Sequence, residues 1–157
     1  MAQNNTIDDL NRLVSVNKNA EAGFASAAES VKNSELETLF GNYAKQHSKF
    51  ATELQDEVRR LKGDITDSGT FGGALHRSWM DLKAALSGGA AATSILKSCE
   101  GAEQSVEVAY IDAVDANPSG QTHALIAKQR AQIEGFRTHL ARLVGETKDG
   151  VEFQKNE

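Results

Sequence analysis

The rest of the chain can be placed around the stretch SELETLFGNYAKQHSKFATELQDEVRRLK, residues 34–62. Its large side chains recur at steps of four and three, the spacing of one face of an α-helix, and they are Leu36, Phe40, Tyr43, His47, Phe50, Leu54, Val58 and Leu61. Ser34 and Glu37 have the spacing of a reciprocal N-terminal cap. We therefore expect a long helix over 34–62 that buries this face, with a histidine at its middle.

Composition narrows the classes of protein that the chain can belong to. The 157 residues carry a net charge of -5 with no basic face, which argues against nucleic-acid binding. A single cysteine excludes an internal disulfide and fits a reducing compartment. The sequence shows neither a signal-peptide pattern nor an apolar run that could span a bilayer. We expect a single cytoplasmic domain over residues 1–157.

Three further long helices are expected over residues 6–32, 90–116 and 119–145. The first follows a Thr6–Asp9 cap, and polar residues interrupt the apolar face of each helix near its middle. Only a short break at Asn33 separates the first two helices, so they should be antiparallel. The polar tail from 146 to 157 is expected to fray.

The connection between the second and third long helices is predicted to be a long crossover over residues 63–89. It carries a short amphipathic helix, about 71–86, marked by Leu75, Trp79, Leu82 and Leu86. A connection of this length can carry the chain along the whole bundle, so the third helix should run parallel to the second. The predicted fold class is all-α: an up-down-down-up four-helix bundle of ferritin-like layout.

Several short motifs resemble an uncharacterised bacterial family of ferritin-like four-helix-bundle proteins, a domain of unknown function. The resemblance covers nearly the whole chain, and the motifs are Gly23-Phe24, Ala27-Ala28-Glu29, Phe50-Ala51, Glu53-Leu54, Gly73-Ala74-Leu75-His76-Arg77 with Trp79, and Cys99-Glu100 with Glu103. The resemblance implies a fold and brings no activity, substrate or cofactor.

The ferritin-like layout raises the question of a di-metal centre, whose carboxylate-bridged form needs two Glu-x-x-His pairs. Three residues before the four histidines stand Ala44, Gly73, Gly120 and Phe136, so that form is absent. A row of three carboxylates remains, Glu100, Glu103 and Glu107. Only Glu103 lies beside the apolar face of the helix expected over 90–116. Glu100 and Glu107 fit a solvated helix face better.

Aligning the helices by their expected directions brings polar residues of every long helix to one level. This predicted midplane cluster comprises Asn17, Glu21, Tyr43, His47, Glu103, Gln129 and Gln132. In one interpretation these residues hydrogen-bond to one another and fix the helix register. In the other, Glu21, His47 and Glu103 hold one iron, manganese or zinc ion. We favour the structural interpretation, because a lone histidine makes a poor transition-metal site.

The crossover offers a second group of residues, His76, Arg77 and Trp79, which we expect to anchor it to the bundle, with Glu29 a possible carboxylate partner. No catalytic constellation is present in the sequence. The leading functional hypothesis is a non-enzymatic helical module without a cofactor that acts through self-association, as a dimer, or through a protein partner. The alternative is a metal-binding protein with a reduced midplane site that could be redox-active.

Overall fold

The computed structural model describes residues 2–66, 73–89, 91–116, 118 and 120–148, and five α-helices make up nearly all of them. These are α1 (Ala2–Ser30), α2 (Ser34–Arg60), α3 (Gly73–Ser87), α4 (Ala92–Asp115) and α5 (Gly120–Lys148). The described residues contain no β-strand, so the chain is all-α. None of their helices is both long and apolar enough to cross a bilayer.

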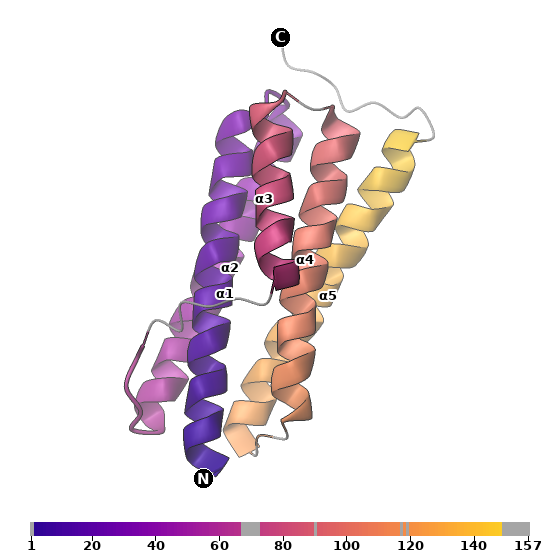
Figure 1. The fold of residues 1–157 in the computed structure, drawn as a ribbon. Coiled ribbons are helices and arrows are strands. Elements are labelled where there is room, and N and C mark those ends of the chain that lie inside the picture. Colours follow the sequence, from indigo (N-terminus) through magenta and orange to yellow (C-terminus); the bar gives the residue numbers. More distant parts are fainter. Residues whose placement is uncertain (1, 67–72, 90, 117, 119, 149–157) are drawn as a thin grey trace.

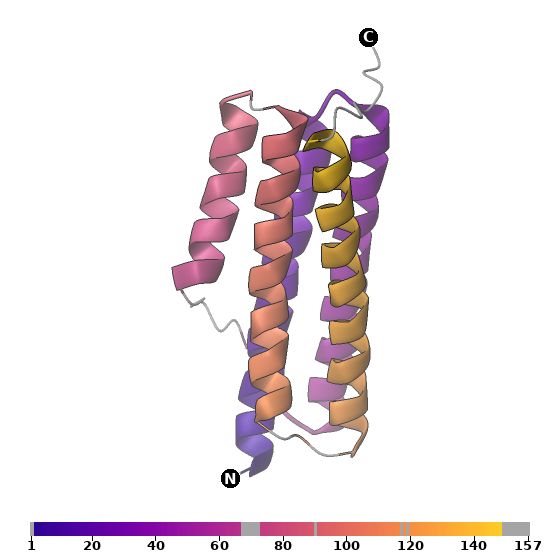
Figure 2. The same cartoon turned by 90° about the vertical axis from the view of Figure 1, so that its right-hand side faces the viewer.

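The four long helices lie side by side, and the short helix α3 packs on their outside (Figures 1 and 2). Helix α1 packs on α2 and α4, and α5 packs on α4 and α2, so α2 and α4 face each other across the diagonal. Figure 1 shows α1 and α5 running in one direction, and α2 and α4 in the other. Residues 67–72, the middle of the expected crossover, lie outside the described residues.

Both ends of α2 are fixed by local interactions. The N-cap is Asn33, not Ser34 as the sequence suggested, and its Oδ1 accepts hydrogen bonds from the backbone N–H groups of Glu35 and Leu36 at 2.9 and 3.1 Å. At the other end Lys62 adopts a left-handed φ of 62°, and the Gly63 N–H donates to the carbonyl of Val58. This is a Schellman-type stop, so α2 ends at Arg60 and not at residue 62.

The other boundaries differ from expectation by a few residues. Helix α1 begins at Ala2, so the Thr6–Asp9 pair lies within the helix and does not cap it. Helix α5 continues through Gly145 to Lys148, so fraying from residue 146 was wrong for the first three of those residues. The remaining bounds, of α3 and α4, shift by one or two residues. Helix ends depend on backbone bonds that side-chain periodicity does not encode.

The core consists of the apolar faces of the four long helices. Its fully buried members include four aromatic side chains, Phe24, Phe40, Phe50 and Tyr110. Leu10, Leu54, Leu96 and Ile133 fill the space along the bundle and are also without exposed surface. This apolar burial supplies most of the stabilisation of helices whose propensity alone would not fold them.

Helix α3 is held against the bundle by one aromatic side chain, one leucine and a pair of serines. The indole ring of Trp79 lies on the backbone of Gly23 in α1, with its ring at 88° to that of Phe24. Leu82 is 1% exposed, and the Ser78 hydroxyl lies 2.8 Å from that of Ser105 in α4. The contact with Trp79 explains a glycine inside α1, because a Cβ atom there would overlap the ring.

Replacing Gly23 by alanine should therefore destabilise the protein by about 1–3 kcal/mol, the usual cost of overpacking. Gly41→Ala is the matched control, since a Cβ at this position in α2 meets nothing within 4 Å. The control should stabilise the protein by up to about 1 kcal/mol through helix propensity. Urea unfolding measures both; equal effects of the same sign would show that Trp79 does not pack on Gly23.

Candidate functional site

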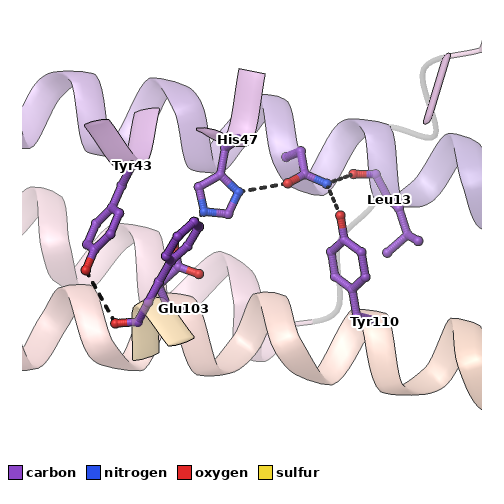
Figure 3. Close-up of polar contacts among 7 residues, drawn as sticks. Leu13, Tyr43, His47, Glu103 and Tyr110 are labelled. Atoms are coloured by element: carbon purple, nitrogen blue, oxygen red, sulfur yellow. Dashed lines mark hydrogen bonds and ion pairs between the residues drawn. The ribbon is translucent and has the colours of Figure 1, made fainter. Parts of the chain in front are cut away.

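Every long helix of the bundle places a polar side chain in its interior. Asn17 on α1, His47 on α2, Glu103 and Tyr110 on α4, and Gln129 on α5 have no exposed surface. We call these five residues the buried polar network. Figure 3 shows the part of it around His47, with the side chains of α2 and α4 pointing toward one another.

Asn17 sets the direction of the hydrogen bonds in the network. Its Nδ2 donates to the backbone carbonyl of Leu13 at 2.8 Å and to the Tyr110 hydroxyl at 2.7 Å. Because a carbonyl can only accept, the amide nitrogen must face Leu13, and Oδ1 is left facing His47. The Nδ1 atom of His47 lies 2.8 Å from that oxygen, so Nδ1 must carry a hydrogen and donate it.

The His47–Glu103 contact closes the network across the diagonal of the bundle. Nε2 of His47 lies 2.5 Å from Oε1 of Glu103, and both side chains are fully buried. Since Nδ1 already carries a hydrogen, a single proton between Nε2 and Oε1 completes the hydrogen bond, whether it resides on the nitrogen or on the oxygen. With that proton the pair has no net charge, which suits an apolar interior.

The opposite end of the network reaches α5 and the edge of α2. The Tyr110 hydroxyl donates to Oε1 of Gln129 at 2.6 Å. Nε2 of Gln129 in turn donates to the Phe50 carbonyl and to the carboxylate of Glu53, at 3.3 and 3.2 Å. Two backbone carbonyls, one in α1 and one in α2, therefore terminate the chain of hydrogen bonds, which joins all four long helices.

One atom of the network has no partner. Oε2 of Glu103 is buried and accepts no hydrogen bond from the described residues. Burial raises the pKa of Tyr43 and of Cys99, and the negative charge of Glu103 adds to that rise. Burial and Glu103 also raise the pKa of Tyr110, against an opposing effect of the Asn17 hydrogen bond. All three groups thus stay neutral near Glu103, and the Cys99 thiol is a poor nucleophile.

Aromatic rings enclose the imidazole of His47. The Phe24 ring is stacked on it, with centroids 5.7 Å apart and an angle of 6°. The rings of Phe50 and Phe136 meet it edge-on, at 86° and 70°. Trp79 of α3 packs on the Phe24 ring, so α3 contacts the aromatic shell around the buried pair.

The structure brings together most of the predicted midplane cluster. Asn17, His47, Glu103 and Gln129 belong to one network, whereas Tyr43 is buried beside it and only makes a long, 3.5 Å hydrogen bond to the Phe136 carbonyl. Gln132 is exposed and therefore does not belong to the cluster. Gln132 follows Gln129 by three residues, about 60° around the helix, and this rotation places it outside the buried face of α5.

The three predicted metal ligands are not placed together. Glu21 is half-buried, and no hydrogen bond joins it to His47 or to Glu103, which bond to each other. Across the part of the chain that the structure describes, no group of three His, Cys, Asp or Glu side chains is arranged to hold a metal ion. As they stand, these residues do not fit a metal centre.

Of the expected crossover anchor, Trp79 makes the contact with α1. Arg77 and Glu29 are both exposed, and the described contacts include no ion pair between them. The side chains of His76 and Leu75 lie outside the described residues. The anchor that the structure shows is therefore apolar, with the Ser78–Ser105 hydroxyl pair as its polar contact.

Sequence reasoning missed two buried carboxylates outside the network. Glu107 was assigned to a solvated face, but it is 5% exposed and pairs with Arg137 of α5 at 2.8 Å. Glu57 is 3% exposed. Its carboxylate accepts two hydrogen bonds from the Arg60 guanidinium and one from the Thr122 hydroxyl. The Arg60 hydrogen bonds lower the pKa of Glu57. Each buried carboxylate bonds to a side chain of a neighbouring helix, Arg137 of α5 for Glu107 and Thr122 of α5 for Glu57. The spacing within one helix does not show such a partner.

Fold and site together define an all-α protein whose long helices are joined through a buried polar network. The chain belongs to the family described as Domain of unknown function (DUF2383), whose model matches residues 5–116. The match begins within α1, covers α2 to α4 with Asn17, His47, Glu103 and Tyr110 included, and ends before α5. No curated protein matches the chain, and no solved structure does.

Removing the hydroxyl of Tyr110 tests whether the network contributes to stability. Tyr110→Phe leaves Oε1 of Gln129 buried without its donor, at a cost of about 1–3 kcal/mol. Tyr43→Phe is the matched control: its hydroxyl makes only a 3.5 Å hydrogen bond, so the loss should be under about 1 kcal/mol. Denaturant unfolding of both variants gives the comparison, and equal losses would contradict the assignment of Tyr110 to the network.

Proposed function

We propose that this protein is a ferritin-like four-helix bundle that works as a non-enzymatic module, through self-association or by binding a protein partner. The helix directions in Figure 1, with α2 parallel to α4 and a short helix between them in sequence, support the ferritin-like assignment. The free thiol of Cys99 favours a reducing compartment such as the cytoplasm.

The observation that carries this proposal is how the network uses its polar atoms. Its donors and acceptors, apart from Oε2 of Glu103, bond to one another, to Glu53 or to two backbone carbonyls. A catalytic site needs groups directed at a place where a substrate can lie. Groups paired in this way instead favour a network that specifies helix register.

The outer surface supports action through contacts between proteins. Met80 on α3 and Val108 on α4 are each 51% exposed. Single exposed apolar residues are common, and these two lie on different helices, so each offers a separate position for a contact. Figure 2 shows the two helices beside each other on one side of the bundle. A protein–protein interface has an apolar core inside a polar rim, and an exposed apolar side chain can form part of such a core.

Metal binding is the second candidate, and Oε2 of Glu103 is the observation that favours it. A buried carboxylate oxygen without a partner is costly, and a bound cation would remove that cost. Iron, manganese or zinc held by Glu21, His47 and Glu103 would require Glu21 to turn inward and the His47–Glu103 hydrogen bond to open. A redox-active metal would supply oxidation chemistry, which the described residues do not supply.

Mass measurement and metal analysis of the same preparation test the two candidates. For the leading proposal we expect a dimer or a partner complex by light scattering and no stoichiometric metal in protein purified without chelator. His47→Leu should leave the metal content at zero and change stability by up to a few kcal/mol. A stoichiometric transition metal that is lost in His47→Leu would overturn the non-enzymatic proposal in favour of the metal centre.

A further inference from the structure

The outward face of α4 carries a regular seam of residues. They follow steps of four and three, as in a helix–helix contact, and are Lys97, Gly101, Gln104, Val108, Asp112 and Asp115. All are exposed except Gly101, which is half-buried, and a Cβ atom there would meet nothing within 4 Å. Figure 2 shows α4 at the front of the bundle between α3 and α5, so the three helices form one broad side of the molecule.

The charges of this seam are arranged against the dipole of their own helix. A helix N-terminus favours acidic side chains and a C-terminus favours basic ones, yet α4 has no acidic residue in its first turn and no basic residue in its last. Instead Asp112 and Asp115 lie in its last turn, and Lys97 lies in its second turn. In the described residues none of these three enters an ion pair.

Four of the six seam residues are matched in pairs when the seam is reversed about its middle. Lys97 and Asp115 lie nine residues before and nine residues after Val106, and Gln104 and Val108 lie two before and two after it. A two-fold axis at the level of Val106 would therefore place each Lys97 opposite the Asp115 of a second copy. The same axis would place each Val108 opposite a Gln104 near the centre of the contact, as an isologous contact requires.

We propose that the α4 face is a two-fold interface at which the α4 helices of two copies pack antiparallel. The second copy supplies an acidic end beside Lys97 and a basic end beside Asp115, which offsets the unfavourable charge placement within each helix. Gly101 permits close approach of the partner helix, and Val108 is covered. This inference rests on the proposed function in its first form, in which the protein acts through self-association.

Val108→Arg and Met80→Arg form a matched pair for the test. Both residues are 51% exposed, but Met80 is two residues from Ser78, which contacts α4. That separation, about 200° around the helix, turns Met80 away from α4. In sedimentation equilibrium the wild type should dimerise. Val108→Arg should raise the dimer Kd by about tenfold or more, equivalent to 1.4 kcal/mol, and Met80→Arg should leave it unchanged.

A charge exchange provides an independent check. Lys97→Asp should weaken the dimer by placing two acids opposite each other. Monomer stability should change little, because Lys97 is exposed and enters no ion pair in the described residues. Combining it with Asp115→Lys should restore dimerisation. A wild-type dimer that is insensitive to Val108→Arg and Lys97→Asp would overturn this interface and leave self-association standing. If the wild type stays monomeric at a protein concentration of about 100 μM, 100 times a micromolar Kd, both this interface and self-association as such would be overturned.

Discussion

The hydrogen bond between Nε2 of His47 and Oε1 of Glu103 fixes the position of α2 against α4. It spans 2.5 Å in a site with no solvent exposure and joins α2 to α4 across the diagonal. A buried pair of this kind adds little net stability over an apolar pair. Its effect is on specificity: an axial shift of α2 against α4 would leave Nε2 of His47 and the carboxylate of Glu103 in the core without a hydrogen-bond partner.

The remaining packing keeps this pair in place and excludes water from it. Asn17 fixes the tautomer of His47 because its own amide is oriented by the Leu13 carbonyl. Phe24 stacks on the imidazole and in turn carries Trp79 of α3, so the short helix completes the shell around the pair. In this arrangement Oε2 of Glu103 stays buried without a hydrogen-bond partner, which is unfavourable. Glu103 is therefore the residue of the network most suited to bind a ligand.

The sequence predicted the helices and the height along the bundle at which the buried polar network lies, but not which residues form it. Apolar periodicity locates long helices, and counting from their ends places His47 and Glu103 at one level. Level alone could not exclude Gln132, because height along the bundle does not show in which direction a side chain points. The burial of Glu107 likewise depends on Arg137 of another helix. Asn33 and Ser34 are both good caps, and only backbone geometry distinguishes them.

The most direct test of this account is a double-mutant cycle on His47 and Glu103, each replaced by leucine alone and together. If the two side chains form one buried pair, each single replacement strands its partner, and the double replacement recovers much of the loss. We expect a coupling free energy of about 2 kcal/mol or more from denaturant unfolding. Additive losses, with a coupling below about 0.5 kcal/mol, would show that the two residues do not depend on each other and would contradict the account.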